Sequence, residues 1–234
     1  MKTIPVWKHA ARVWPLALWQ LALGGGSALV LTILFVQLAD SVVEDQRTAF
    51  DRTVILAIHS LTTPELTSVM LVGTNLGSAL ILIPLSLGIM AWLLLHQRVR
   101  VAVLTAIGGL GALGLEAALK ALFQRPRPEV FTPLQHATGY SFPSGHTTAS
   151  VVIYGLLAYL IGQRLHGLSR VLLLLAAISL VVFVALSRVY LGVHYPTDVL
   201  GSLLVGSAWL IIALLAIRLA EDDQRQPKAE HESS

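Results

Sequence analysis

Six long apolar segments constrain the fold of this 234-residue chain more than any other feature of its sequence. Crossing the hydrocarbon core of a bilayer takes about 17–25 helical residues, and each segment is long enough. The segments are Leu16–Leu38, Leu66–Leu95, Val99–Leu122, His146–Gly162, Leu168–Leu186 and Val199–Ile217. Because backbone groups in hydrocarbon must be hydrogen-bonded within the protein, each segment is expected to be a helix. The sequence therefore predicts an all-α integral membrane bundle of six transmembrane helices.

The charge content agrees with a membrane protein and excludes several other classes. Charged residues make up 12% of the chain, against about 25% in an ordinary soluble domain. The absence of cysteine excludes disulfides, Cys-ligated zinc and a thiol nucleophile. The net charge of +3 comes from basic residues that are scattered between the apolar segments, so we expect no nucleic-acid partner. Nothing in the sequence indicates an oligomeric state.

The regions beside the apolar segments carry further predictions. The first segment is longer than the apolar core of a signal peptide and is expected to remain as an uncleaved span. The second exceeds a straight crossing and should tilt, bend or project from the membrane. Between them, Phe50–Leu61 has an apolar stripe opposite Asp51, Arg52 and His59, which fits a short helix in the membrane interface or an ordinary helix packed on the bundle. Residues 1–220 are expected to form one domain, and the polar tail 221–234 is expected to be disordered.

Basic residues between the segments predict the orientation of the bundle. Ten of the sixteen Lys and Arg residues fall at one set of segment ends, which the positive-inside rule places in the cytoplasm. They are Lys2, Lys8, Arg12, Arg98, Arg100, Arg164, Arg170, Arg218, Arg225 and Lys228. Both termini of this multi-pass protein of the cell (inner) membrane should therefore be cytoplasmic. The opposite ends should face the periplasm or the extracellular space.

The first of three polar runs is Lys120-x6-Arg127-Pro128, which begins at the outer end of the third apolar segment. Lys120 alone would read as a lysine that reaches for the membrane surface. The prolines of the following run stop the helix and hold Arg127 beside Lys120, and guanidinium groups suit phosphate oxygens. Arg125 is interpreted as a contact to lipid headgroups. Glu116 lies one turn before Lys120, and this spacing predicts an ion pair.

The second run, Pro143-Ser144-Gly145-His146, comes directly before an apolar helix. Free backbone N–H groups at the start of a helix bind anions. Gly145 permits the close approach of a ligand, and the Ser144 hydroxyl adds a donor. Alternatively, Ser144 is an ordinary helix cap and His146 an interfacial histidine.

The third run, Ser187-Arg188-x5-His194-x3-Asp198, joins the last two segments. The spacing of four residues lets the carboxylate of Asp198 reach the imidazole of His194 and fix its tautomer. A structural His–Asp pair at a helix start is the alternative. All three runs fall at segment ends on the same predicted side, and ionisable residues near a bilayer are usually functional.

Together the three runs resemble the signatures of the type-2 phosphatidic acid phosphatase superfamily, whose site is shared with vanadium haloperoxidases and glucose-6-phosphatase. The patterns K-x6-RP, PSGH and SR-x5-H-x3-D are all present without substitution, and the resemblance covers about Asp51 to Ile217. It implies a six-helix membrane bundle that dephosphorylates a lipid without a metal or another cofactor. In agreement, Asp198 is the only carboxylate of the set, which does not form a Mg²⁺ cage.

The resemblance also implies roles for individual residues. His194 would attack phosphorus and form a phosphohistidine, with Asp198 orienting it. His146 would protonate the leaving oxygen and later activate water. The groups that would bind the phosphate oxygens are the side chains of Lys120, Arg127, Ser144 and Arg188 and the backbone N–H of Gly145.

Two other activities remain open at this point, a lipid phosphotransferase with the same intermediate and a membrane transporter. A transporter usually places its polar site near the midplane, whereas these runs lie at segment ends. The resemblance suggests phosphatidic acid, phosphatidylglycerophosphate, diacylglycerol pyrophosphate or undecaprenyl pyrophosphate as the substrate. An outward-facing site favours the polyprenyl pyrophosphate.

Overall fold

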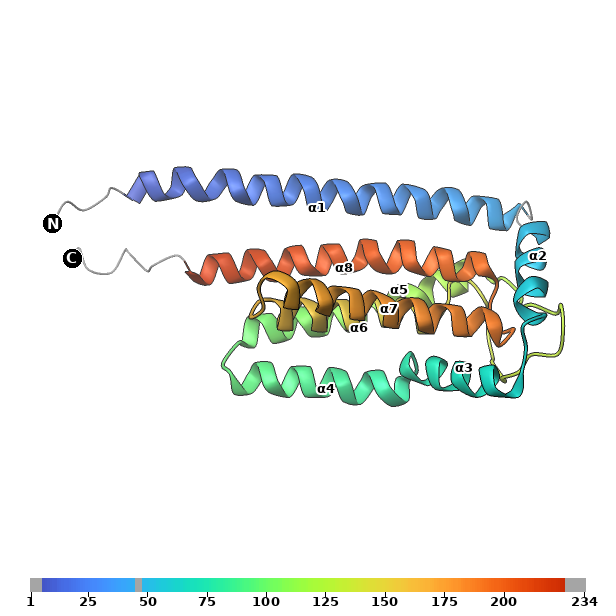
Figure 1. Ribbon diagram of the computed structural model, residues 1–234. Helices are drawn as coiled ribbons and strands as arrows, with labels where there is room; N and C mark the ends of the chain where they lie inside the picture. Colours follow the sequence, from blue (N-terminus) through green and yellow to red (C-terminus); the bar gives the residue numbers. More distant parts are fainter. Residues whose placement is uncertain (1–5, 45–47, 226–234) are drawn as a thin grey trace.

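The computed structural model describes residues 6–44 and 48–225, and within these ranges it contains helices and no strand. The helices are α1 (Val6–Val43), α2 (Thr48–His59), α3 (Pro64–Leu76), α4 (Ala79–Leu95), α5 (Val99–Phe123), α6 (Gly145–Gly162), α7 (Gly167–Tyr190) and α8 (Pro196–Arg225). All except α2 run along one common direction (Figure 1). The predicted all-α architecture is confirmed.

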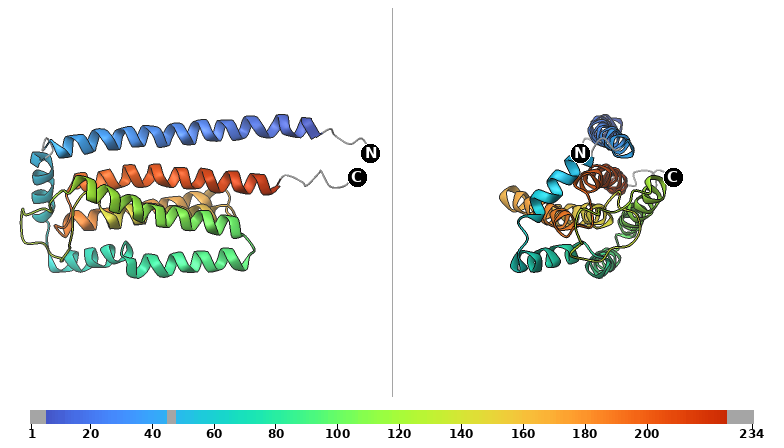
Figure 2. Two further views of the ribbon diagram at one scale, coloured as in Figure 1. Left: turned by 180° about the vertical axis from the view of Figure 1, so that it is seen from behind. Right: turned by 90° about the vertical axis from the view of Figure 1, so that its right-hand side faces the viewer.

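Six stretches of these helices are long and apolar enough to cross a membrane, as predicted. They are Leu18–Val43, Pro64–Leu95, Val99–Phe123, Gly145–Gly162, Gly167–Tyr190 and Pro196–Asp222. α8 packs against α1, α5 and α6, and the end-on view shows α1 at the edge of the bundle beside α8 (Figure 2). The protein is therefore a helical membrane bundle with six spans.

The second span bends, as its length predicted, because it consists of two helices. α3 ends at Leu76, and α4 begins at Ala79 after a break at Gly77 and Ser78. A Cβ atom at Gly77 would lie 2.5 Å from Val184 Cγ1 of α7. Glycine is therefore needed where the bend presses against the neighbouring helix.

α2 is the short helix predicted between the first two spans, and it lies across the end of the bundle of long helices (Figure 1). The predicted division of its faces is wrong at Asp51. This carboxylate is fully buried, whereas Phe50 of the expected apolar stripe is 47% exposed. The reason is that Asp51 has buried hydrogen-bond partners on other segments, which local periodicity does not reveal.

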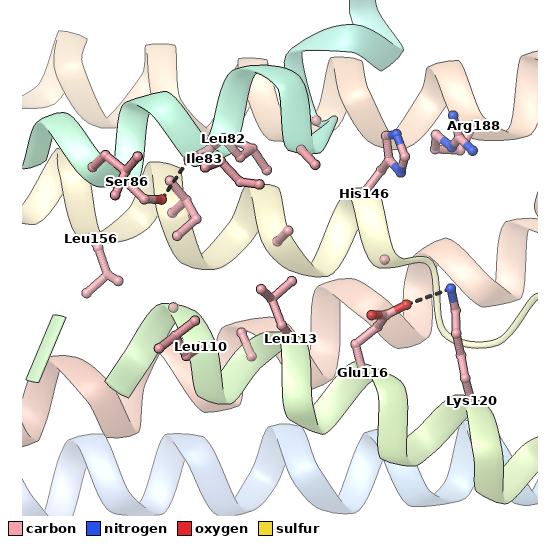
Figure 3. A pocket seen from close by; sticks show the side chains of 18 of the residues that line it. Leu82, Ile83, Ser86, Leu110, Leu113, Glu116, Lys120, His146, Leu156 and Arg188 are labelled. Carbon is pink, nitrogen blue, oxygen red and sulfur yellow. Dashed lines mark hydrogen bonds and ion pairs between the residues drawn. The ribbon is translucent and has the colours of Figure 1, made fainter. Parts of the chain in front are cut away.

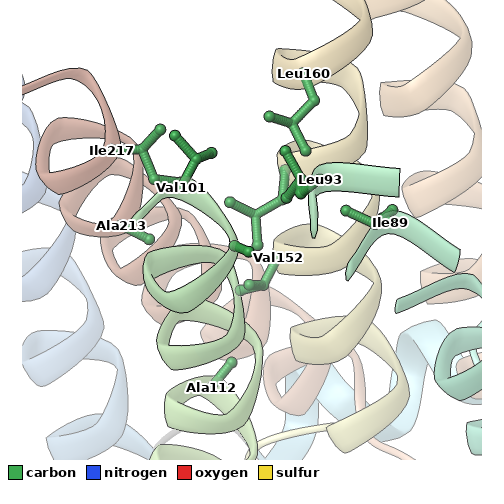
Figure 4. Packing of buried hydrophobic residues seen from close by; sticks show 10 residues of the cluster. Ile89, Leu93, Val101, Ala112, Val152, Leu160, Ala213 and Ile217 are labelled. Atoms are coloured by element: carbon green, nitrogen blue, oxygen red, sulfur yellow. The ribbon is translucent and has the colours of Figure 1, made fainter. Parts of the chain in front are cut away.

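Small residues let the long helices approach closely in the interior of the bundle, as at Gly108 and Gly111 of α5. The indole Nε1 of Trp209 on α8 donates to the carbonyl oxygen of Gly108 on α5 at 2.8 Å. The same ring also packs directly on Gly111. Trp209 also packs against a buried apolar cluster, which Figure 4 shows. It contains Ile89, Leu93, Val101, Ala102, Ala112, Val152, Leu156, Leu160, Ala213 and Ile217.

A polar cluster joins three helices at the opposite end of the bundle from α2. Glu221 of α8 is 8% exposed, pairs with Arg98 and accepts a hydrogen bond from Tyr159 at 2.9 Å. α8 continues to Arg225, so the predicted boundary at 220/221 falls inside this helix. Residues 226–234 of the predicted tail lie outside the described ranges.

Candidate active site

The three polar runs meet at the end of the bundle that α2 crosses. They border one cavity of about 640 Å³. Of the eight predicted site residues, six line it, namely Lys120, Arg127, Gly145, His146, Arg188 and His194. The other two, Ser144 and Asp198, are fully buried behind the wall. Helices far apart in the sequence thus bring the predicted residues together (Figure 3).

His194 lies in the turn between α7 and α8 and is only 2% exposed. Its Nδ1 atom is 3.3 Å from Asp198 Oδ2. Its other nitrogen, Nε2, is 3.4 Å from Arg127 Nη1. Because a guanidinium can only donate, this arrangement assigns the proton to Nδ1 and the lone pair to Nε2. The ring nitrogen with the lone pair is the one suited to attack a phosphate.

The electrostatic setting keeps His194 uncharged at neutral pH. Burial lowers the pKa of His194 to about 4, with Asp198 opposing the change and Arg188 and Arg127 adding to it. A nucleophilic imidazole must be neutral, so the site meets this requirement. Burial also lowers the pKa of Arg127, while Asp198 and Glu116 raise it.

Arg188 supplies the clearest unused donor of the site. The side chain is 3% exposed, and Nη1 donates to Gln135 Oε1 at 2.9 Å and to Thr74 Oγ1. Its Nε atom is buried and has no hydrogen-bond partner in the structure. A buried donor without a partner is costly, and an anionic oxygen in the cavity would satisfy it.

The sequence predicts that the Arg127 guanidinium binds phosphate oxygens. In the structure Arg127 lines the cavity, and its N–H groups donate to the protein itself. Its nitrogens donate to four backbone carbonyls, those of Gly139 at 3.0 Å, Thr138 at 2.7 Å, Tyr140 at 3.4 Å and Val193 at 2.7 Å. The guanidinium thereby holds the loop before α6 to the turn that carries His194. It contributes positive charge to the cavity without a free bidentate face.

Lys120 and Glu116 form the predicted ion pair, with 2.6 Å between Nζ and Oε1. The pair stands where the polar end of the cavity meets its apolar part (Figure 3). Glu116 also explains the small residue on α6, because a Cβ atom at Gly145 would lie 2.6 Å from Glu116 Oε1. Gly145 therefore permits the approach of α5 to the start of α6.

Ser144 caps α6 without using its side chain in the expected way. α6 begins at Gly145, and no side-chain cap bond is made by Ser144. Its hydroxyl oxygen accepts from Thr147 Oγ1 at 3.1 Å, and its carbonyl accepts from Ser202 Oγ at 3.0 Å. The hydroxyl does not reach the cavity, so the expected donor at this corner is reduced to the backbone N–H groups at the helix start.

The sequence did not predict several residues that support the site. Arg125 was interpreted as a lipid-headgroup contact, but its side chain is 12% exposed and paired with Asp51 at 2.8 Å and Asp198 at 2.5 Å. Ser141 Oγ donates to Asp198 Oδ2. The only sequence signal was the placement of Arg125 between the helix end and the first of two prolines, which holds it on the same stiff loop as Arg127.

Away from the polar end, the cavity is apolar and lies between α4, α5 and α6. Figure 3 shows apolar side chains, among them Leu82, Leu110 and Leu113, around this part of the cavity. Apolar lining residues include Leu82, Ile83, Leu87, Met90, Leu110, Leu113, Ile153 and Leu156. A cavity with a cationic end and an apolar body fits an amphiphile with an anionic head. Within residues 6–44 and 48–225, no group of three His, Cys, Asp or Glu side chains could hold a metal ion.

Fold and site define a class of protein, a helical membrane enzyme with a cationic pocket at one end of its bundle. The family model of the PAP2 superfamily matches residues 99–221, and the chain belongs to this superfamily. The chain is 34% identical to phosphatidylglycerophosphatase B of Bacillus subtilis, over 75% of this chain and 87% of the relative. It is also 35% identical to the undecaprenyl-diphosphatase BcrC of the same organism, over 56% of this chain and 64% of the relative.

A solved structure shows the same fold. The crystal structure of a transmembrane PAP2 type phosphatidylglycerolphosphate phosphatase from Bacillus subtilis matches with a TM-score of 0.76 and 29% identity, covering 86% of this chain and 98% of the other. The predicted family is confirmed, and the protein is a membrane phosphatase of a family with lipid phosphatases. These relatives do not support the transporter alternative.

Proposed function

We propose that this protein hydrolyses a phosphomonoester or pyrophosphate of a membrane lipid through a phosphohistidine on His194. One observation carries the proposal: His194 lines a cavity that has cations at one end and an apolar body between three helices. The apolar part suits the lipid chains, and the cationic end suits the phosphate. The names of the relatives support phosphatidylglycerophosphate and undecaprenyl diphosphate as substrate classes.

The residues divide the reaction into two steps. His194 Nε2 attacks phosphorus, the bond from phosphorus to the lipid oxygen breaks, and His146 donates a proton to that oxygen. His146 then takes a proton from water, which attacks phosphorus, breaks the bond to nitrogen and releases inorganic phosphate. Asp198 holds Nδ1–H throughout, as the base partner of a serine-protease triad does.

Three cations stabilise the charge on the equatorial oxygens of the transition state. Arg188 contributes the unpartnered Nε, Lys120 contributes the two N–H groups that Glu116 does not use, and Arg127 adds its charge. The N–H groups at the start of α6 complete the pocket. We assign catalysis to the helical bundle as one domain. The Ser144 hydroxyl does not contact the substrate in this proposal and only shapes the start of α6.

Because protein cations supply the positive charge, we expect catalysis to survive the removal of divalent metals. Purified protein in detergent, with excess EDTA, should release phosphate from at least one of four lipids: phosphatidylglycerophosphate, phosphatidic acid, diacylglycerol pyrophosphate and undecaprenyl pyrophosphate. The first three have the same tails, so differences between them report on the headgroup. Vanadate should inhibit by occupying the phosphate pocket. Activity that EDTA abolishes and Mg²⁺ restores would contradict the proposal.

We also propose that the pocket faces outward and that both termini are cytoplasmic. The described start of α1 and end of α8 lie at the same end of the bundle, opposite α2 (Figure 1). Arg98, Arg164 and Arg218 lie toward that end, which agrees with the positive-inside rule.

A cysteine scan tests this orientation without background, because the chain has no cysteine. Thr138→Cys, in the loop beside the cavity, is expected to react with an impermeant maleimide in intact cells. His166→Cys, in the turn between α6 and α7, should react only after permeabilisation. Both positions are exposed. The reverse labelling pattern would place the pocket in the cytoplasm and favour lipids of the inner leaflet.

A further inference from the structure

Three buried ionic side chains from different parts of the chain meet behind His194. Asp51 comes from α2, Arg125 from the loop after α5, and Asp198 from the first turn of α8. Both carboxylates are fully buried, and the Arg125 side chain is 12% exposed. Asp51 and Arg125 do not line the cavity described above. Asp51 lies outside the three polar runs, and Arg125 is an x position of the first run to which the reaction assigns no direct role.

One guanidinium is shared by the two carboxylates. Arg125 Nη1 donates to Asp198 Oδ1 at 2.5 Å, and Nη2 donates to Asp51 Oδ2 at 2.8 Å. Asp51 also accepts two bonds from Thr197, from the backbone N–H at 3.0 Å and from the hydroxyl at 2.6 Å. Asp51 thus binds both Arg125 and Thr197, the residue directly before Asp198.

The arrangement fixes which oxygen of Asp198 faces His194. Oδ1 is taken by Arg125, whereas Oδ2 receives the backbone N–H of Tyr195 at 2.8 Å, the Ser141 hydroxyl and His194 Nδ1. Arg125 itself is held by stacking on the Tyr195 ring, with its guanidinium carbon 4.0 Å from the ring centre. Rotation of the Asp198 carboxylate would break several hydrogen bonds at once. These partners therefore fix the orientation of the carboxylate toward the imidazole of His194.

The charge count gives Asp51 a second effect. With Asp51 present, one cation is shared by two carboxylates, so Asp198 keeps negative charge for the imidazole. Burial alone would lower the pKa of Arg125, but Asp198 and Asp51 outweigh it and raise the value. Arg125 therefore stays charged. Removing the negative charge of Asp51 and removing the positive charge of Arg125 change the electrostatic field at His194 in opposite senses.

We propose that the Asp51–Arg125 pair positions Asp198 for the reaction at His194, so that the helix lying across the bundle end is part of the catalytic scaffold. Both are positioning residues, because neither touches the phosphate pocket. This inference rests on the proposed function. A purely structural anchor for α2 is the competing explanation, and it would not alter the ionisation of the nucleophile.

The pH dependence of kcat/KM separates the two explanations. The charged and titratable groups that face His194 are Asp198 of α8, Arg127 of the loop, Arg188 of α7 and His146 of α6. Asp51→Asn removes a negative charge behind them, which disfavours the imidazolium and moves the acid limb to lower pH. Arg125→Gln removes a positive charge and moves it to higher pH. A single substrate is used throughout, so its own ionisation is constant.

The expected loss appears in kcat rather than in KM. Removing an outer hydrogen-bond partner of a catalytic group typically costs about 10- to 100-fold in activity, and Asp51→Asn should fall in this range. Arg125→Gln leaves two buried carboxylates without a cation and is expected to lower the yield of folded protein. Adding Asp51→Asn to Arg125→Gln should restore yield and part of kcat. Exposed matched controls are Arg52→Gln on α2 and Glu65→Gln on α3.

The outcomes are distinguishable from those of the proposed function. If the wild-type protein releases no phosphate from any of the four lipids, the proposed function fails and these variants are not needed to reject it. If the wild type is active, opposite shifts of the acid limb support the positioning role. Shifts in the same direction, no shift, or a rise in KM with unchanged kcat would overturn it and leave the phosphatase reaction standing.

Discussion

His194→Ala is expected to abolish lipid dephosphorylation while leaving the bundle folded. The substitution removes the only imidazole whose Nδ1 is held by a carboxylate in the pocket. Deleting a nucleophile in subtilisin lowers kcat about 10⁶-fold, and we expect a loss of at least about 10⁴-fold here. Phosphate release in detergent measures the effect, and size-exclusion chromatography checks the fold.

His96→Ala is the matched control for this variant. His96 is exposed at the opposite end of the bundle and bonds the carbonyl oxygen of Trp92 at 2.8 Å. It should retain the activity of the wild type. An active His194→Ala protein would remove the nucleophile from the proposed reaction, whatever the other variants do.

Asp198→Asn is the second substitution with a large expected effect. Asn can turn its amide N–H toward His194 Nδ1, which would place the imidazole proton on Nε2 and take away the attacking lone pair. The equivalent change in a serine-protease triad lowers kcat about 10⁴-fold. We expect a loss of about 10³- to 10⁴-fold in kcat, measured by phosphate release at saturating lipid.

Two features separate this effect from misfolding. Asn keeps an oxygen that can accept from Arg125, so the buried guanidinium retains a partner. Asp40→Asn, at an exposed position of α1, is the control for loss of a carboxylate near the same end of the bundle. Near-normal kcat in folded Asp198→Asn protein would show that the carboxylate does not set the tautomer.

Much of the architecture follows from local sequence patterns. Apolar length alone predicted the six spans, and the excess length of the second predicted a tilt, a bend or a projection, of which the structure shows a break at Gly77. The ion pair between Glu116 and Lys120 followed from a spacing of one helical turn. These features depend on residues close in sequence, for which helix geometry is sufficient.

The supporting part of the site could not be predicted in the same way. Asp51 and Arg125 are 74 residues apart, and their pairing depends on how α2 crosses the bundle end. The periodic pattern predicted only that Asp51 lies opposite the apolar stripe of its helix, because such a pattern contains no information about a buried cation from another segment. The same holds for the hydrogen bond from Arg188 to Gln135, because Gln135 lies in a loop without periodicity.

Ser144 and Arg127, whose assignment to phosphate binding stays a prediction, show a related effect. Their residue types predicted donors, but the tertiary structure decides which acceptors those donors meet. Arg127 finds backbone carbonyls of the loop and turn, and Ser144 finds Thr147. Arg188 differs because its Nε is buried without an acceptor. Sequence therefore identified which chemical groups gather, whereas the structure shows which of them remain available.

Trapping the covalent intermediate tests the central claim most directly. Purified protein is mixed with a lipid substrate carrying ³²P in its terminal phosphate, and the reaction is stopped in alkaline denaturant after a few milliseconds. A phosphohistidine is labile in acid and stable in base, so the wild-type protein should retain label that base preserves and acid removes. Mass spectrometry of the peptides should place it on His194, and His194→Ala should carry none. Rapid phosphate release without protein-bound label, or label on another residue, would contradict the account.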